Sequence, residues 1–579
     1  MAACPPLRAL VSLVSLILAV ALAACRSEDA SQDPDASSEA GAPTCDDPSG
    51  DDLTPRFAFS SDDRGAFPAR PACTGSSNDG GDSDGGSDAS VPPPDGDPRG
   101  GLPPGGNGGP DDGGAAQPPD GGAASDASAV VPPPALNPVA NEYGTNADVV
   151  LPDTEQSILA DDFRVTLNTN GRHCETCHSP DNSWSTTPAA FQGRFERGLP
   201  HFSGRCDRYP TDDTATRNDD LEPVFRKRDG SNSPLLDLST PEARRRAYSL
   251  LLSRAVIRIG LAVPADADFD LVAVEDPYGF ASTKELSLFR RSPPMANLRL
   301  STTVMWDGRE NRPCETLTAT LVRQAEHAIT GHAEGTLPTQ PILQKIVTAE
   351  LGLYVAQLIH SRAGQLNEGG AHGGPYFLAQ VPFYPAVNAF DRRDPRGQPY
   401  TAEVFTLYSA WAALPADTES NRARAQIAEG ERLFNSRLFT ISGASGFNDQ
   451  LGCSEITATC GACHNTPNVG TSSEGRFVDI GISDEGNRAS ELPLYTFRAK
   501  ATGQIRKTSD PGRALISGRW QDLNRFKVPS LRALAGRAPY FHDGSAASLD
   551  EVIDYHDRRF AIHLTQDEKA ALVMFLSAL

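Results

Sequence analysis

Two copies of one five-residue pattern constrain this chain more than any other feature. Residues 174–178 (CETCH) and 460–464 (CGACH) both read C-x-x-C-H. In this pattern the two thiols form thioethers with haem vinyl groups, and the adjacent His is the proximal iron ligand. A redox-active dithiol does not require the His, and a zinc site needs a second ligand pair nearby. We therefore expect two covalently bound haem c groups, held by Cys174, Cys177 and His178 and by Cys460, Cys463 and His464.

The first 25 residues are typical of an export signal. Arg8 precedes an apolar run over residues 9–24, which ends in Leu-Ala-Ala before Cys25. The run is shorter than the roughly 20 residues of a spanning helix. Leu-Ala-Ala-Cys is typical of a bacterial lipobox, with an ordinary secretory peptide as the alternative. Because Arg26 follows the Cys, we expect an exported lipoprotein anchored through Cys25 to the outer membrane of a Gram-negative bacterium, in the periplasm or on the cell surface.

The negative charge is concentrated in one segment. The 579 residues carry a net charge of −23, but residues 26–140 hold 21 Asp and Glu against 5 Lys and Arg, a net of −16. Subtracting this segment and Arg8 leaves −8 for residues 141–579. Residues 91–125 contain 11 Gly and 9 Pro, a composition that cannot form a core. We expect a disordered acidic linker over residues 25–140 and no binding of nucleic acid through a basic surface.

The cysteines outside the haem motifs and the signal segment are odd in number. They are Cys45, Cys73, Cys206, Cys314 and Cys453. An oxidising compartment favours pairing, and Cys206 with Cys314 is the pair expected in the folded part.

The chain around each motif is predicted to be helical. Apolar residues recur at helical spacing over residues 420–435, and Ser548 and Thr565 each begin a capping pattern that ends in Glu. Further helices are expected over residues 243–257, 317–329 and 342–359. Because strand-like runs are few, we predict an all-α fold with two cytochrome c-like haem domains and long loops. The expected boundaries are 1–24 for the signal, 25–140 for the linker, 141–415 for the N-terminal haem domain and 416–579 for the C-terminal one.

Further motifs lie between and after the two C-x-x-C-H patterns in a specific order. W-D-G-R begins at Trp306 and is followed by Gln324-Ala325, and the second C-x-x-C-H is followed by K-V-P-S-L-R over 527–532 and P-Y-F-H-D-G over 539–544. This order resembles the bacterial di-haem cytochrome c peroxidases. It is equally similar to their relative that matures the tryptophan-derived cofactor of methylamine dehydrogenase.

The resemblance implies a role for each haem. In this family the N-terminal haem reacts with peroxide, which falls here to the haem of His178. The C-terminal haem takes electrons from a donor, which falls to the haem of His464. The family's Trp lies between the haems and relays electrons or holes, a role that the resemblance assigns to Trp306.

The peroxide-reacting haem also needs an acid–base group. Gln324 and Glu334 keep the family's ten-residue spacing between a Gln and an acidic residue over the iron, although the interval from Trp306 to Gln324 is longer here. An acid–base group takes a proton from the near oxygen of peroxide and delivers one to the leaving oxygen. Glu334 can do this, and His332 and His327 on the same segment are alternatives.

The distal ligand of the second haem departs from the family. His556 lies 14 residues after His542, where the peroxidases have a Met and the maturation enzyme is expected to have a Tyr. We expect His464 and His556 to ligate this iron, with Tyr555 as the close alternative and Met574 as a distant one. A second imidazole lowers the haem potential relative to a thioether. A low-potential haem is a poorer acceptor of electrons from a high-potential cytochrome, so this ligand departs from the ordinary peroxidase role. His542 is expected to pack near a propionate or a domain interface.

Two other family features lack a clear counterpart. The peroxidases use a Thr to help hold calcium, and Arg537 stands at that place, which disfavours a calcium site. A loop His blocks the peroxidatic iron in the family, and His201 is the candidate here.

Together these features predict a di-haem c-type peroxidase. It would reduce hydrogen peroxide with electrons from a donor cytochrome c or a similar small redox protein, passed through the C-terminal haem to the N-terminal haem. The alternatives are a peroxide- or oxygen-dependent oxidase of a protein or small molecule, and a non-catalytic di-haem electron carrier. A carrier needs no acid–base group over an iron.

Overall fold

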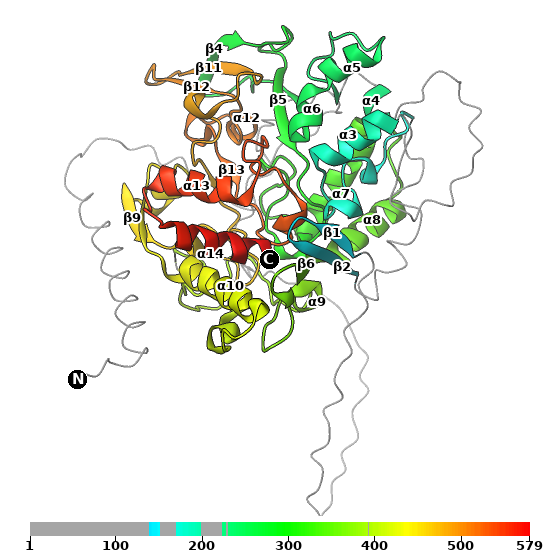
Figure 1. The fold of residues 1–579 in the computed structure, drawn as a ribbon. Helices are drawn as coiled ribbons and strands as arrows, with labels where there is room; N and C mark the ends of the chain where they lie inside the picture. The colour runs from blue at the N-terminus through cyan, green and yellow to red at the C-terminus, as the bar shows by residue number, and fades with distance from the viewer. Residues whose placement is uncertain (1–137, 151–168, 198–222, 227–229, 392) are drawn as a thin grey trace, which may run out of the picture. The chain divides into compact units, whose positions relative to one another are not determined.

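The computed structural model describes residues 138–150, 169–197, 223–226, 230–391 and 393–579 (Figure 1). All of these residues fall within one compact unit. The expectations for the signal segment, Cys25, the acidic linker, Cys206 and His201 concern residues outside these ranges. Cys314, the other half of the expected pair, is disulfide-bonded.

The helices are concentrated around the two haem motifs and at the end of the chain. The longer ones are α3 (Pro188–Arg197), α7 (Leu317–His327), α8 (Gln340–Gly352), α10 (Glu419–Ser436), α13 (Leu549–Phe560) and α14 (Gln566–Ser577). The shorter ones are α4 (Pro223–Arg226), α5 (Pro241–Ala247), α6 (Ser249–Arg254), α9 (Gly374–Leu378), α11 (Asn448–Leu451) and α12 (Ala514–Ser517). A π-helix over Ala328–His332 continues α7.

The strands pair in antiparallel sheets. One sheet has the order β1 (Val139–Asn141), β2 (Gly144–Val150), β6 (Leu353–His360), β7 (Gly364–Gln365), and another the order β12 (Ile505–Thr508), β11 (Leu494–Ala499), β4 (Phe269–Glu275). Three strand pairs complete the set: β3 (Val256–Leu261) with β5 (Leu286–Arg291), β8 (Phe439–Ser442) with β9 (Glu455–Ala458), and β10 (Phe477–Val478) with β13 (Phe526–Lys527).

These sheets show that the predicted all-α fold class is wrong, because the described part of the chain is mixed α and β. Two predicted helices fail for the same reason. The helix expected over 342–359 ends at Gly352, and the following run of Leu, Tyr, Val and Ile forms strand β6. The helix expected over 243–257 is two short helices, and Ala255 takes a left-handed conformation before β3 begins. β-Branched and aromatic residues favour a strand wherever a partner strand is available.

The other helix predictions are confirmed. Helix α7 and the π-helix that continues it cover the expected 317–329 segment, and α10 covers 420–435 with Thr418 as its N-cap. Ser548 caps α13, and Thr565 and Glu568 form both hydrogen bonds of a capping box on α14. Helices α10, α13 and α14 pack side by side (Figure 1).

A glycine allows helices α10 and α14 to approach closely. A Cβ at Gly430 would lie 2.0 Å from the carbonyl oxygen of Ala571. The cluster between them includes the fully buried Ile427 and Phe575. This helix pair forms one wall of the C-terminal haem cavity described below.

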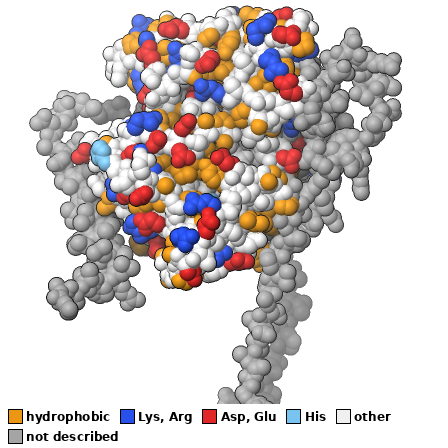
Figure 2. Space-filling view, viewed as in Figure 1, with side chains coloured by type: hydrophobic (Ala, Val, Ile, Leu, Met, Phe, Trp, Pro, Cys, Tyr) orange, Lys and Arg blue, Asp and Glu red, His pale blue; other side chains and the backbone are white. Residues whose placement is uncertain are grey.

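The two predicted haem domains are joined by a sheet. Strand β4, from the N-terminal segment, pairs along its length with β11 from the C-terminal segment (Figure 1). The boundaries 141–415 and 416–579 stay a prediction, and the haem-binding segments are held together by this pairing. Within the described ranges no helix combines the length and the hydropathy needed to cross a membrane. Figure 2 shows acidic and basic side chains interspersed over one face of the molecule.

Candidate haem sites

The first C-x-x-C-H motif is folded so that its His presents one ring nitrogen to a cavity. Cys174–Thr176 form a turn of 3-10 helix, and the backbone N–H of His178 donates to the carbonyl of Cys174 at 2.9 Å. The ring Nδ1 of His178 lies 3.3 Å from the carbonyl oxygen of Trp184. Burial lowers the pKa of His178 to about 4. The imidazole is therefore neutral, with Nδ1–H donating and Nε2 left as a metal ligand.

The second motif repeats this geometry. Cys460–Ala462 form a 3-10 turn, and the backbone N–H of His464 donates to Cys460 at 3.2 Å. Nδ1 of His464 lies 2.6 Å from the carbonyl of Gly470, again six residues beyond the His. Burial also lowers the pKa of His464 to about 4. Two independent segments thus orient an imidazole as an iron-ligating His requires.

Each motif lines its own internal cavity. Cavity one, of about 200 Å³, is lined by Cys174, Cys177 and His178. Cavity two, of about 260 Å³, is lined by Cys460, Cys463 and His464. The structure therefore places all six predicted haem-attachment residues at two cavities within the same compact unit.

Trp306 lies between the two cavities and lines both. Its indole Nε1–H donates to the carbonyl of Arg291 at 2.8 Å, and its own carbonyl accepts from the N–H of Lys527 at 2.8 Å. Segments from both halves of the chain therefore hold this residue in place. The position is the one that the predicted relay role requires.

Buried ion pairs hold the W-D-G-R motif in place directly after Trp306. Asp307 is fully buried and contacts the guanidinium groups of Arg290 and Arg309, while Arg290 also binds Asp510 through a contact of 2.7 Å. Burial alone would raise the pKa of Asp307, but the two guanidinium groups hold that pKa well below its usual value. Gly308 has a φ of +69°, and a Cβ there would lie 2.2 Å from the ring of Phe477.

Two buried arginines and a half-buried lysine at the cavities suit an anionic cofactor. Arg291 and Lys527 line both cavities and Arg537 lines cavity two. Within the described residues none of the three has a carboxylate partner, and the guanidinium of Arg291 donates only to backbone carbonyls of Thr186, Arg537 and Pro539. Burial lowers the pKa of Lys527 to about 8, with repulsion from Arg537 as a second cause. Haem propionates would supply the negative charge that these groups lack.

His556 lines cavity two together with His464. Helix α13 carries it into the cavity lining, where its Nδ1 lies 2.8 Å from the carbonyl of Val552. Its proximity contributes to the lowered pKa of His464. The alternatives point elsewhere: the hydroxyl of Tyr555 donates to the carbonyl of Ile480 at 2.8 Å, and Met574 is in the apolar core. Neither lines the cavity.

His542 also lines cavity two but is engaged in packing. Its ring stacks on Phe526 with centroids 3.8 Å apart and lies 6.3 Å from the ring of Trp306. Its Nε2 is 3.2 Å from the hydroxyl of Ser483. The contacts place it between the segments that carry the two motifs, as the sequence-based expectation described.

The wall of cavity one formed by α7 and the π-helix separates the predicted acid–base residues. Gln324 and His332 line the cavity. Glu334 is exposed, has a φ of +51° and does not belong to the lining. Nδ1 of His327 lies 2.9 Å from a carboxylate oxygen of Glu310, outside the lining. The structure thus brings Gln324, His332 and Trp306 to one cavity and leaves Glu334 and His327 apart from it.

Sequence reasoning missed Glu350, which also lines cavity one. A signal for it exists, because Leu343, Ile346, Val347 and Glu350 follow the i, i+3, i+4, i+7 spacing of a buried helix face. An acid on such a face is unusual.

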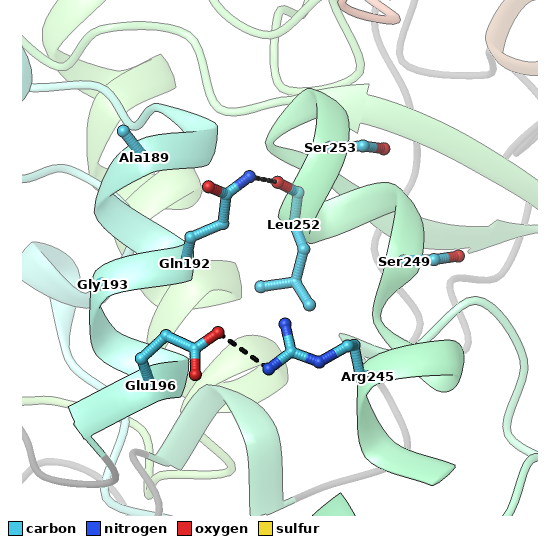
Figure 3. A pocket seen from close by; sticks show the side chains of 8 residues that line it. All are labelled: Ala189, Gln192, Gly193, Glu196, Arg245, Ser249, Leu252 and Ser253. Atoms are coloured by element: carbon cyan, nitrogen blue, oxygen red, sulfur yellow. Dashed lines mark hydrogen bonds and ion pairs between the residues drawn. The ribbon is translucent and has the colours of Figure 1, made fainter. Parts of the chain in front are cut away.

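A third hollow lies at the surface between α3 and α6 (Figure 3). Arg245 and Glu196 form an ion pair of 2.7 Å there, and the amide of Gln192 donates to the carbonyl of Leu252 at 2.7 Å. Its described lining residues belong to neither of the two cavities that the C-x-x-C-H motifs line.

Comparison with known proteins gives relatives of one kind. No family model matches the chain. It is 24% identical over 315 residues to cytochrome c peroxidase IdrP2 of Denitromonas iodatirespirans, covering 52% of this chain and 70% of that protein. It is 33% identical over 121 residues to cytochrome c551 peroxidase of Nitrosomonas europaea, covering 21% and 30%. It is 23% identical over 306 residues to the methylamine utilization protein MauG of Methylorubrum extorquens, covering 50% and 64%.

The resemblance to the di-haem peroxidase and MauG superfamily is confirmed. The alignments span between 30% and 70% of the relatives' own lengths. The activity, the substrates and the partners of this chain are therefore matters for proposal.

Proposed function

We propose that this chain is a di-haem c-type peroxidase that reduces hydrogen peroxide to water with electrons from a cytochrome c or a similar small redox protein. When bound, the haem at His464 would accept electrons from the donor and the haem at His178 would deliver them to peroxide. The observation that carries the proposal is that two separate C-x-x-C-H cavities share Trp306 as a common wall.

The side chains divide the work between the cavities. Cys174 and Cys177 would hold one haem, and Cys460 and Cys463 the other. His464 and His556 both line cavity two and would together hold the iron of the haem there, so peroxide would bind in cavity one. Two groups of the α7 wall, the amide of Gln324 and the imidazole of His332, would orient peroxide by hydrogen bonds.

Export and anchoring through Cys25 are part of the proposal. A lipoprotein in the periplasm or at the outer membrane would meet small redox proteins and peroxide in the same compartment. C-type haem attachment in an oxidising compartment agrees with the disulfide at Cys314.

The proposal is tested with the purified, haem-loaded full chain. Reduced cytochrome c is mixed with the protein and peroxide, and its oxidation is followed optically. We expect oxidation that requires both protein and peroxide, and a fall of at least tenfold in Trp306→Phe with both haems still attached. Trp520→Phe, which is outside both cavities, serves as the matched control and should keep the wild-type rate.

Two results would redirect the assignment. Both haems staying low-spin in every redox state, with no response to peroxide, would indicate an electron carrier. A peroxide response without oxidation of cytochrome c would indicate an oxidase of a protein or small molecule. The His464 and His556 pair favours this second candidate, because bis-imidazole ligation gives a low potential that suits storage of an oxidising equivalent.

A further inference from the structure

Cavity one contains a buried carboxyl group that no basic side chain among the described residues neutralises. Glu350 lies in the last turn of α8, and its side chain is 6% exposed. Its Oε2 has no hydrogen-bond partner, and the residue makes no ion pair within the described ranges. Glu350 lines cavity one together with Cys174, Cys177 and His178. The unpaired carboxyl therefore lies at the cavity of the first haem motif.

The helix around Glu350 gives no structural reason for an acid. Leu343, Ile346 and Ala349 on the same helix belong to an apolar cluster, and a Leu at position 350 would extend that cluster. Burying an unpaired polar group destabilises a fold, so packing alone does not account for an acid here. The carboxyl also sits at the helix C-terminus, where the helix dipole disfavours a negative charge.

Basic groups elsewhere in the cavity do not compensate this charge. The basic side chains of the lining are Arg172, Arg290, Arg291, Arg309 and Lys527, and its imidazoles are His173, His178 and His332. None of them binds Glu350. Burial raises the pKa of Glu350 to about 8, and Glu350 in turn contributes to the raised pKa of the Cys174 thiol, which shows that the two groups are close. At neutral pH the residue is a carboxylic acid that carries its proton inside the cavity.

We propose that Glu350 is a further acid–base residue of cavity one, which donates its proton to the oxygen of peroxide that leaves as water. The inference rests on the proposed function. In the balanced reaction, H₂O₂, two electrons and two protons give two water molecules as the O–O bond breaks. The electrons come from the donor protein, one proton comes from Glu350 and the other from solvent. The carboxylate then takes a proton back from water.

This assignment differs from the one that the sequence spacing gave. Glu334 is exposed and outside the lining, whereas Glu350 is buried within it. A proton donor works best when its pKa lies near the working pH and when it can reach the reacting oxygen. The pKa of Glu350 meets the first condition, and the position of Glu350 in the lining of cavity one places its carboxyl in the cavity where peroxide is proposed to bind.

The test compares Glu350→Gln with the wild-type chain, both loaded with haem. Gln keeps the shape and the neutral charge but cannot donate an acid proton. We expect the rate of the peroxide reaction, measured by stopped flow, to fall by roughly 10²–10⁴-fold at unchanged haem content. Glu326→Gln, on the neighbouring α7 but outside the lining, is the matched control and should react as the wild type does.

A second readout does not depend on turnover. Infrared difference spectra of wild type against Glu350→Gln should show a protonated carboxyl band at neutral pH that is lost as the pH rises past about 8. Glu350→Leu should unfold at the same or a higher urea concentration than wild type while it loses the peroxide reaction. A residue with only a structural role would instead destabilise the fold when it is replaced.

The possible failures are distinct. A Glu350→Gln rate within about twofold of wild type, or an ionised carboxylate at neutral pH, would overturn the role of Glu350 and leave the peroxidase proposal standing. A wild-type protein that does not react with peroxide would overturn the proposed function itself.

Discussion

Asp307, directly after Trp306, offers the sharpest test of how the proposed relay residue is held. Its carboxylate is fully buried and contacts Arg290 and Arg309. The change Asp307→Asn keeps the size of the side chain and removes its charge. The hydrogen bond that the backbone N–H of Arg309 donates to Oδ1, at 3.2 Å, can still form, so the substitution isolates the ionic contribution.

The expected loss follows from the burial of both partners. Arg290 is 1% and Arg309 5% exposed at the side chain, so neither guanidinium can turn to water when the carboxylate is lost. Removing one partner of a buried pair typically costs 3–5 kcal/mol. Arg290 keeps its contacts of 2.7 and 2.9 Å with Asp510. We therefore expect Asp307→Asn to lower the free energy of unfolding by about 3 kcal/mol.

Urea denaturation of the haem-loaded protein, followed by circular dichroism, measures this change. The matched control is Asp270→Asn, because Asp270 pairs with Arg498 at 3.5 Å and both side chains are about half exposed. An exposed pair contributes about 0–1 kcal/mol and is screened by salt. The buried network should be insensitive to added salt. An Asp307→Asn effect no larger than that of the control would refute the reasoning.

Three further predictions address other parts of the molecule. Gly308→Ala should lower the free energy of unfolding, measured in urea, by roughly 2–4 kcal/mol, because the new Cβ would clash with the ring of Phe477 and the φ is +69°. The control is Gly279→Ala, which has a φ of +66° but nothing within 4 Å of the new Cβ, and it should cost only about 1 kcal/mol. His556→Ala should convert the haem of cavity two from low-spin to high-spin, and an unchanged optical spectrum would exclude His556 as its ligand. The pKa of Glu350 is raised from 4.5 to about 8 in the folded state, so the unfolded chain loses this proton first as the pH rises. The free energy of unfolding should therefore fall by up to roughly 1.4 kcal/mol per pH unit between these two pKa values. Urea titrations of Glu350→Gln at several pH values should lack this pH dependence.

The secondary structure was predictable wherever a local signal decided it. The capping patterns at Ser548 and Thr565 bring their partners within one helical turn, so α13 and α14 form where the sequence indicated. The segment after Gly352 lacked such a signal. Its Leu, Tyr, Val and Ile side chains are compatible with a buried helix or a buried strand, and pairing with β2 across more than 200 residues makes it strand β6.

The candidate site shows the same division. The spacing of Gln324 and Glu334 suggested that both face one cavity. A π-helix lies between them, which alters the number of residues per helical turn, and only Gln324 lies in the lining. Counting 14 residues from His542 reached His556, which does line cavity two. Helix α13 carries His556 to that lining, and its role as an iron ligand stays a prediction. Glu350 could not be predicted as a site residue, because only the tertiary structure shows that its carboxyl lines a cavity and has no partner among the described residues.

The sequence by itself was enough to predict the covalent chemistry of this protein. C-x-x-C-H is a local pattern, and its thiols and imidazole act within one turn of the chain, so two haem attachments are predicted without knowledge of the fold. The tertiary structure alone decided which side chains share a cavity: Trp306 lines both cavities, His556 lines cavity two with His464, and Glu350 lines cavity one without a partner among the described residues. These relations depend on contacts between segments far apart in the chain, which no local pattern encodes.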